Sequence, residues 1–212
     1  MLEREIPGSG YENATRNKIL DVATKLIARK GFGAVSMRDI AKEVGIQMSS
    51  IYYYYDSKDA LLEDILSCFE NGYKHYFDWL TEANMKADSL ETLIDNMFNR
   101  EFLEMRDPAG CLGMSLIIKE QHNNKSACTR VFELFFDYSI RRLQADFDGL
   151  IKKGIIPQSD TKMMATILMC CVITFNDIRI HEYTGTKPPI DCMVLYSNLK
   201  SFITSALTLG MK

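Results

Sequence analysis

The spacing of apolar residues constrains this chain more than any other feature, because nearly every periodic stretch repeats at the step of an α-helix. The apolar residues from Leu62 to Leu80, for example, keep an i, i+3/i+4 spacing throughout. No stretch alternates convincingly between apolar and polar residues as a half-buried strand would. The sequence therefore predicts an all-α fold of about nine helices.

Start and stop signals divide the N-terminal part into three helices. A first helix over residues 13–30 ends at Gly31, which can adopt the left-handed conformation of a helix C-terminus. Ser36 is a suitable N-cap for a short second helix, and Gly45 ends that helix. A third helix is expected over residues 48–54. Two short helices joined by a tight turn thus follow a longer one.

The rest of the chain is also expected to be helical. Ser57 can cap a long helix over residues 58–84. Asp88 with Glu91 resembles a capping box, which would open another helix that lasts to roughly residue 106. Further helices are expected over residues 111–122, 125–153, 160–183 and 190–209.

Composition excludes several classes of protein. The chain has 212 residues, of which 47% are apolar and 25% charged, as in an ordinary globular protein. No apolar run approaches the ~20 residues that span a bilayer, and the N-terminus lacks the apolar core of a secretion signal. A cytoplasmic location is therefore expected. The sequence shows no clustered carboxylates, no nucleophile with its base and no phosphate-binding loop, which argues against an enzyme.

Six cysteines lie in the chain without metal-ligand spacing, at positions 68, 111, 128, 170, 171 and 192. We expect them to be reduced and to behave as small buried apolar residues. No metal or other cofactor is expected.

Charge is unevenly divided along the chain. The net charge is −3, but residues 1–60 hold nine Lys and Arg against eight Asp and Glu, whereas residues 61–212 hold sixteen against twenty. A slightly basic N-terminal part on an acidic chain gives weak support for contact with DNA at that end.

Residues 31–61 carry most of the functional information. Their inward positions are small or branched, so that the two short helices can cross closely around Gly45. These inward positions are Ile40, Ala41, Val44, Ile46 and Ile51. The outer face of the later helix carries short polar groups and tyrosines, which lets it enter a major groove about 12 Å wide.

This part of the chain resembles the DNA-binding domain of the TetR/AcrR family of bacterial repressors. The match covers roughly residues 16–62, and the whole string of motifs in register is highly specific. The motifs are Ile19-Leu20, Ala23, Gly31-Phe32, Ser36-Met37-Arg38-Asp39-Ile40-Ala41, Val44-Gly45-Ile46, Ser49, Ile51-Tyr52-Tyr53, Ser57-Lys58 and Leu61. Tyr54 departs from the pattern, since the family often has His before an aromatic residue there, but a phenol can still donate to a phosphate.

The resemblance implies two domains: a three-helix helix-turn-helix DNA-binding domain over residues 1–57, and a helical ligand-binding and dimerisation domain over residues 58–212. It implies a homodimeric transcriptional repressor of double-stranded operator DNA. A small apolar or aromatic effector would release the DNA by shifting the helix over residues 58–84. No membrane partner is expected. Redox switching through Cys111, at a predicted helix start, is an alternative, and simple burial of Cys111 competes with any sensing role.

The resemblance also places the DNA contacts. The bases would be contacted by residues at the start of the third helix, namely Gln47, Met48, Ser49 and Ser50. For each of them, simple exposure to solvent is the alternative. Phosphates would be contacted by Ser36, Arg38, Tyr53, Tyr54 and Lys58. Four successive tyrosines cannot all face one way on a helix, so packing is expected for Tyr52 and Tyr55. Tyr52 is nevertheless counted with the DNA-binding set.

In the C-terminal part, apolar helical faces are expected to form a ligand pocket and a dimer interface. The pocket residues, for which plain core packing is the alternative, are Tyr73, Tyr76, Phe77, Trp79, Met97, Phe98, Phe102, Met114 and Phe136. By resemblance, the last two helices form a four-helix bundle with a second copy. The interface residues, for which burial within one subunit is the alternative, are Met164, Ile167, Leu168, Cys171, Phe175, Leu195, Leu199, Phe202 and Ile203.

Overall fold

The computed structural model describes residues 10–98, 116, 119–120, 122, 124–184, 187 and 190–209. All regular elements within these residues are helices, which confirms the predicted fold class. None of the described helices is long and apolar enough to cross a bilayer.

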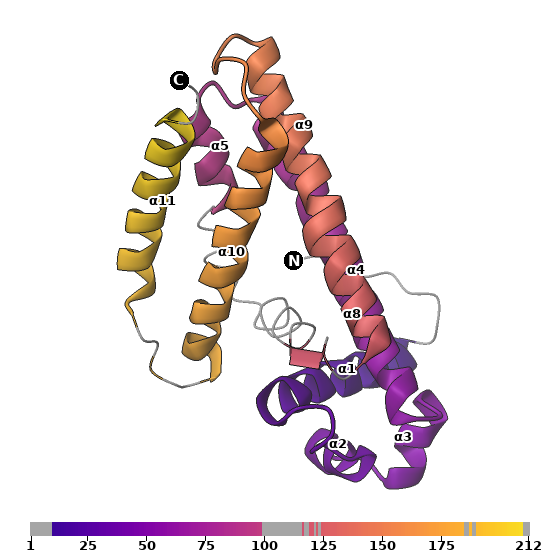
Figure 1. Ribbon diagram of the computed structural model, residues 1–212. Helices are drawn as coiled ribbons and strands as arrows, with labels where there is room; N and C mark the ends of the chain where they lie inside the picture. Colours follow the sequence, from indigo (N-terminus) through magenta and orange to yellow (C-terminus); the bar gives the residue numbers. More distant parts are fainter. Residues whose placement is uncertain are drawn as a thin grey trace.

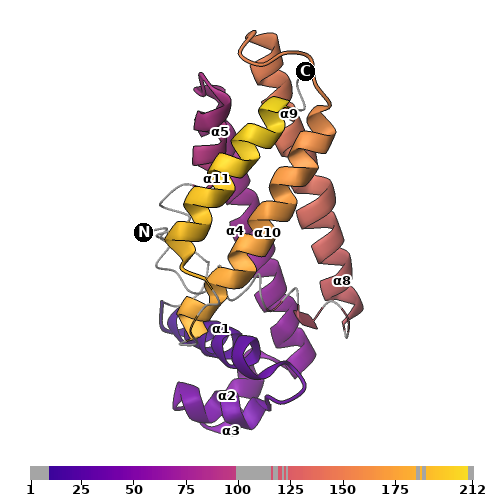
Figure 2. The same ribbon diagram turned by 60° about the vertical axis from the view of Figure 1, so that its left-hand side comes forward.

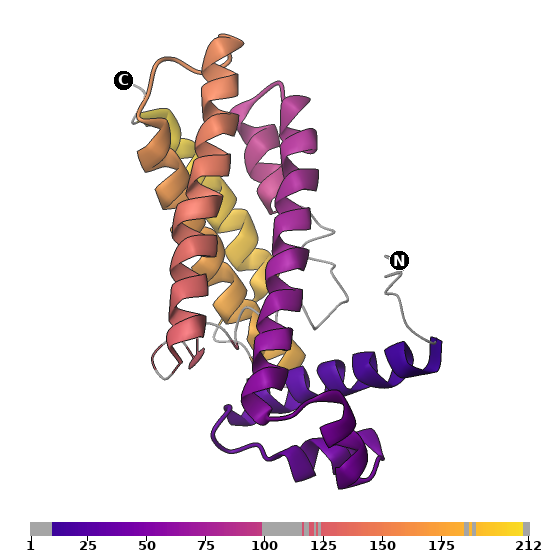
Figure 3. The ribbon, with the colours of Figure 1, turned by 90° about the vertical axis from the view of Figure 1, so that its right-hand side faces the viewer.

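The chain forms a small head and a taller helical bundle (Figure 1). The head consists of α1 (Gly10–Lys30), α2 (Met37–Val44) and α3 (Met48–Tyr54). The long helix α4 (Lys58–Met85) leaves the head and runs to the far end of the bundle, as Figure 3 shows most clearly. The helix bounds of the head agree closely with those predicted from the sequence.

Two glycines with positive φ shape the turns of the head. Gly31 (φ 84°) ends α1 and donates its backbone N–H to the Ile27 carbonyl at 2.8 Å. Gly45 (φ 82°) ends α2 and donates to the Ala41 carbonyl at 3.0 Å. A residue with a Cβ is strained in this left-handed conformation. The predicted stops at these two glycines are confirmed.

Serine side chains begin the helices that follow these turns. Ser36 Oγ accepts the Asp39 N–H at 3.2 Å, and the Asp39 carboxylate accepts the Ser36 N–H at 2.9 Å, which completes a capping box. Ser57 Oγ accepts the Ala60 N–H at 3.0 Å and caps α4. Both predicted caps are confirmed.

The bundle packs helices from the rest of the chain beside α4. These are α5 (Leu90–Met97), α8 (Lys125–Val131), η1 (Phe132–Tyr138), α9 (Ser139–Lys152), α10 (Thr161–Thr184) and α11 (Cys192–Leu209). Among them, α4 contacts α5, α8 and α9. α8, η1 and α9 follow one another without a break, as the predicted helix over residues 125–153 requires. Figure 2 shows α10 and α11 side by side on one face of the bundle.

α5 differs from its prediction at both ends. Its N-cap is Ser89, whose hydroxyl accepts the Thr92 N–H at 3.0 Å, and not Asp88, whose carboxylate instead accepts the Thr92 hydroxyl. Ser89 stands directly before the first helical residue, which is the position from which a side chain reaches this amide. The helix ends at Met97 with a turn at Phe98, and not near residue 106.

The π-helix η1 has no counterpart in the prediction. Ser139, which is fully buried, donates its hydroxyl to the Leu134 carbonyl five residues earlier at 2.6 Å. The same hydroxyl lies 2.8 Å from the Tyr73 hydroxyl of α4. π-type segments are rare and usually form single turns inside α-helices. Here the contacts of Ser139 join the irregular turn to α4.

One continuous core joins the head to the bundle along α4. Leu61 and Leu62 are fully buried near the head, and Phe77 and Leu80 are buried towards the far end. Full burial of such side chains contributes ~1.5–3 kcal/mol each. α4 therefore packs in both parts and connects the core of the head to that of the bundle.

Two cysteines contradict the expectation that all would be buried. Cys128 on α8 and Cys170 on α10 are exposed, whereas Cys68 and Cys171 are half-buried. Helical periodicity alone does not show which side of a helix faces the core. Within the described ranges, no three potential metal-ligating side chains come together.

Candidate nucleic-acid interface

The outer face of α3 presents most of the predicted DNA contacts to solvent. Ile51 in the middle of this seven-residue helix is fully buried and anchors it to the head. Successive side chains of an α-helix are rotated by about 100° around its axis. With Ile51 facing the core, the side chains of the first turn of α3 therefore face the solvent. The exposed residues are Gln47, Met48, Ser49, Ser50, Tyr52 and Tyr53. Such short polar and apolar groups can reach base edges in a major groove.

The N-terminus of α2 lies beside this face, and its Ser36 and Arg38 are exposed. The Ser36 hydroxyl also donates to the Asp39 carboxylate at 2.6 Å. Hydrogen bonds from the side chain and backbone of Ser36 lower the pKa of Asp39 below its usual value. An ionised carboxylate at this helix end competes with an incoming phosphate for the same positive end of the helix.

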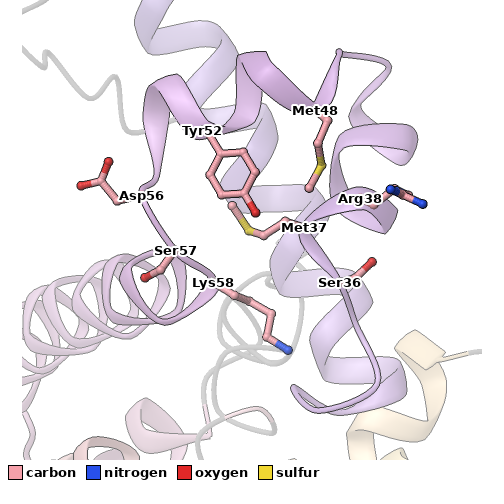
Figure 4. Close-up of a pocket in the computed structure, with 8 residues that line it drawn as sticks. All are labelled: Ser36, Met37, Arg38, Met48, Tyr52, Asp56, Ser57 and Lys58. Carbon is pink, nitrogen blue, oxygen red and sulfur yellow. The ribbon is translucent and has the colours of Figure 1, made fainter.

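A hollow of about 640 Å³ lies between α2, α3 and the start of α4 (Figure 4). Ser36 lies on one side of it and Ser57 with Lys58 on the other, with Met37 between them and the Tyr52 ring above in this view, while the Arg38 guanidinium points outward. Two capped helix N-termini thus border the hollow, and both helices carry a cation in their first turn. Helix N-termini and basic groups attract anions, so the hollow can accept a DNA phosphate. Its lining is Ser36, Met37, Arg38, Met48, Tyr52, Asp56, Ser57 and Lys58.

Lys58 has a structural role that the sequence did not reveal. Its Nζ donates to the carbonyls of Phe32 at 2.8 Å and Val35 at 2.9 Å, and it lies 4.2 Å from the centre of the Phe32 ring. Lys58 thereby ties the start of α4 to the turn before α2. An ammonium has three N–H donors, so its contact with a phosphate stays a prediction that these bonds do not contradict.

The four successive tyrosines have different environments. Tyr53 is 72% exposed and Tyr52 46%, at the edge of the hollow, contrary to the packing expected for Tyr52. Tyr54 is half-buried, with its ring edge-on to Tyr53 at 5.1 Å between centroids. Tyr55 is buried, and its hydroxyl donates to the Asp64 carboxylate at 2.5 Å. The expected packing of Tyr55 against α4 is confirmed.

Comparison with known proteins identifies the family to which this head belongs. Residues 19–65 match the family described as "Bacterial regulatory proteins, tetR family". This range runs from α1 through the helix-turn-helix into α4. Residues 19–65 of the chain are therefore a TetR-family DNA-binding domain.

Individual proteins that resemble the chain are transcriptional regulators. It is 24% identical over 151 residues to IcaR of Staphylococcus aureus, the negative transcriptional regulator of the biofilm operon icaADBC, a match that covers 64% of this chain and 77% of IcaR. Salmonella enterica GusR has a similar fold, with a TM-score of 0.65, 22% identity, and 92% and 95% of the two chains covered. A TetR regulator from Haloarcula marismortui gives a TM-score of 0.68 at 13% identity, with 94% and 100% covered. The protein is thus a DNA-binding transcriptional regulator, related to proteins that are not enzymes.

Most described members of the predicted ligand pocket are core residues of the bundle. Tyr73, Phe77, Met97 and Phe98 are 8% exposed or less. Tyr76 is half-buried and donates its hydroxyl to the Met97 carbonyl at 3.1 Å. Burial raises the pKa of Tyr73 and of Tyr76, so both hydroxyls stay neutral. Their lining of a pocket stays a prediction.

The other described pocket residues reach the surface, although the Trp79 ring lies 6.0 Å from the Tyr76 ring between centroids. Trp79 is 38% exposed and Phe136 40%, so both reach the surface. Phe102 and Met114 lie outside the described residues, as does Cys111, the residue of the redox alternative.

The predicted dimer-interface residues divide into two groups. Met164, Leu168, Phe175 and Ile203 are 6% exposed or less, so they lie in the core of one subunit, with Phe175 at the floor of the groove between α10 and α11. For these four the burial agrees with the alternative of packing within the subunit, because α10 also packs against α9, and their part in a dimer stays a prediction. The remaining residues reach the surface, and they are Ile167, Cys171, Leu195, Leu199 and Phe202.

A shallow groove of about 230 Å³ runs between α10 and α11. It is lined by Cys170, Cys171, Thr174, Phe175, Ile178, Leu195 and Leu199. The sequence prediction missed Cys170, Thr174 and Ile178. Their helical spacing from the exposed Met163 and Ile167 is the signal that could have placed them on one side of α10.

Proposed function

We propose that this protein is a homodimeric repressor that binds a two-fold operator through α2 and α3 and is released by a small apolar or aromatic effector. The exposed face of α3 beside the hollow between two helix N-termini is the observation that carries the proposal. In this arrangement α3 can enter the major groove while the hollow lies over the sugar–phosphate backbone.

The exposed residues divide by the part of DNA that each can contact. Gln47 can read an adenine directly or through water, and Met48 can touch a thymine methyl group. Ser49 and Ser50 are short enough to reach either bases or backbone. Phosphates, which fix the orientation and not the sequence, are assigned to Ser36, Arg38, Tyr52, Tyr53, Tyr54 and Lys58.

Repression is favoured over activation by the relationship to IcaR, which is a negative regulator. A protein that occupies its operator blocks access of other proteins to the same DNA. Such a repressor acts in the cytoplasm, where its operator lies.

The second copy is assigned to the face formed by α10 and α11. Around the groove, Met163 is 55% exposed, Ile167 37%, Val194 52% and Phe202 65%. An exposed apolar area of this kind is typical of a contact between proteins. A two-fold dimer also places two recognition helices about 34 Å apart, which is one turn of DNA.

The effector is assigned to the domain over residues 58–212 and would act through α4, which shares its core with the head over residues 1–57. The effector must bind the released state more tightly than the DNA-bound state, and DNA must weaken effector binding by the same factor. A shift of α4 would change the spacing of the two heads and lower the affinity for the operator.

The direct test is titration of the purified protein with a labelled fragment of the DNA upstream of its own coding sequence, followed by fluorescence anisotropy. We expect sequence-specific binding that weakens steeply with salt. Tyr53→Ala should weaken it by about tenfold or more, whereas Met85→Ala, far from the head, should not. Binding no tighter than to unrelated DNA, together with a genome-wide capture that finds no site, would refute the proposal.

A further inference from the structure

The turn between α1 and α2, residues 31–35, is held from two sides. Lys58 at the start of α4 binds its carbonyls through Nζ, as described above. On the other side, the Phe32 N–H donates to Glu120 Oε1 at 2.9 Å. Glu120 is 88 positions away along the chain, and its backbone carbonyl accepts the N–H of Asn124, the N-cap of α8 in the bundle, at 2.8 Å. The turn is therefore a meeting point of the head, α4 and the segment that carries Glu120.

Glu120 is unusual because its charged side chain is buried, with only 6% of the residue exposed. A buried carboxylate is unfavourable unless hydrogen bonds compensate for the water that it loses. Its bond to the Phe32 amide is charge-assisted and stronger than one between neutral groups. Burial in this position therefore makes the contact costly to break.

Lys119 makes a complementary contact beside it. Its Nζ donates to the Ala28 carbonyl at 3.1 Å, in the last turn of α1. Carbonyl groups at the end of a helix carry partial negative charge and favour a cation. Lys119 thus contacts the Ala28 carbonyl before Gly31, and its oppositely charged neighbour Glu120 contacts the Phe32 amide after it.

The turn leads directly into the DNA-binding surface. Val35 precedes Ser36, the N-cap of α2, and Ser36 lines the hollow assigned to a phosphate. We propose that Glu120, with Lys119, is a positioning residue for operator binding: it holds the turn at residues 31–35 and so couples the bundle to the placement of α2. This inference rests on the proposed function and adds a second route to it besides α4.

The two routes converge on one residue, Phe32. Glu120 accepts a hydrogen bond from the Phe32 amide, and Lys58 donates one to the Phe32 carbonyl. Any movement of α4 relative to Glu120 must therefore deform the turn or break one of these bonds. By linkage, a change in the bundle that breaks the bond to Glu120 weakens DNA binding, and bound DNA makes that change harder.

The test compares Glu120→Ala, which removes the acceptor, with Glu120→Gln, whose amide oxygen retains it. The matched control is Thr161→Val, which removes the hydrogen bond of another buried residue, from Thr161 Oγ1 to Asp148 at 2.7 Å, within the bundle. Hydrogen exchange over residues 28–36 is measured by mass spectrometry on the full chain without DNA. Affinity for the upstream DNA fragment is measured on the same samples, with thermal unfolding to verify that each variant is folded.

We expect Glu120→Ala to speed exchange at the Phe32 amide by about tenfold or more and to weaken DNA binding by about tenfold. Glu120→Gln should restore both to within about threefold of the wild type, and Thr161→Val should change neither. The inference would be overturned if Glu120→Ala kept the exchange rate and DNA affinity of the wild type, or if Glu120→Gln did not restore them. It would also be overturned if Thr161→Val lost as much DNA affinity as Glu120→Ala. If the wild-type protein itself does not bind the DNA fragment, the proposed function fails. Hydrogen exchange at the Phe32 amide still decides whether Glu120 holds the turn.

Discussion

Single side chains in the head serve two purposes at once. Ser36 caps α2 and also lines the hollow, and Lys58 begins α4 and also holds the carbonyls of Phe32 and Val35. A substitution at such a residue changes both the stability of the head and its contact with DNA. Variants for DNA binding are therefore best made on α3, where the exposed side chains of Ser49 and Ser50 carry less of the fold.

Lys58→Met should lower the free energy of unfolding by about 1–3 kcal/mol, because it removes two hydrogen bonds to carbonyls and a cation above the Phe32 ring. Lys25→Met is the control, since Lys25 forms only an exposed pair with Asp21 four residues away and should change stability by less than about 0.5 kcal/mol. Urea unfolding measures both. Equal stability of the two variants would show that Lys58 does not hold the turn.

The same residues show where prediction from sequence ends. Ser36 and Ser57 act on amides three positions away, so local sequence suffices to predict their caps. The bonds of Lys58 to Val35 and of Glu120 to Phe32 join positions 23 and 88 apart. No periodicity in a single sequence reports such contacts, because they depend on how the helices pack.

At the scale of elements, the left-handed glycines set the angles between the helices of the head. Gly45→Ala should lower the free energy of unfolding by about 1–2 kcal/mol, because its φ of 82° is strained for any residue with a Cβ. Gly33→Ala is the matched control, since Gly33 has no positive φ and an added Cβ would meet nothing within 4 Å. Thermal and urea unfolding compare the two. A Gly45→Ala variant as stable as Gly33→Ala would contradict this account of the turn.

The contact between α4 and α9 makes a pH-dependent contribution. Asn84 donates to the Asp146 carboxylate at 2.6 Å. Burial raises the pKa of Asp146 from 3.8 to about 6, against the opposing effects of the Asn84 hydrogen bond and the Arg142 charge. The folded state thus binds this proton more tightly than the unfolded state does, and stability from this group falls as pH rises from about 4 to 6.

Asp146→Asn removes the titration and keeps a side chain of similar shape. We expect the variant to gain stability relative to the wild type as pH rises from 4 to 7, with little difference near pH 4. Urea unfolding at a series of pH values measures this difference, in which other titrating groups cancel. A difference that does not change with pH would show that Asp146 has an ordinary pKa.

The helices themselves were predicted better than their orientation. The spacing along α10 marks a broad apolar face that includes Met164, Ile167 and Leu168, but it does not divide that face between the core and the surface. Met164 and Leu168 turn out to be buried, whereas Ile167 is exposed. The division is set by packing on α9, which is a tertiary property. η1 was missed for a related reason, because its shift in hydrogen bonding leaves the pattern of apolar residues helical.

At the scale of the whole molecule, the proposal requires two heads on one rigid dimer. The apolar surface on α10 and α11 is the part of the described chain assigned to that contact, and Phe202 is its most exposed member at 65%. Large apolar side chains near the centre of an interface carry most of the binding energy.

Phe202→Asp should raise the dissociation constant of the dimer by about thirtyfold or more, because it places a charge where a desolvated apolar contact is expected. Met85→Asp is the control, since Met85 is 69% exposed at the end of α4 and away from this face. Sedimentation analysis over a range of concentrations measures both. Dimers of equal strength would place the interface elsewhere.

The most direct test of the central claim is a DNase footprint of the protein on the DNA upstream of its own coding sequence. The account predicts two protected half-sites related by two-fold symmetry, with centres one helical turn or a multiple of ~34 Å apart. The footprint should be lost in Phe202→Asp at concentrations where the wild type still protects. An unsymmetrical single site, or full protection by the Phe202→Asp monomer, would contradict a dimeric repressor that reads DNA with two copies of α3.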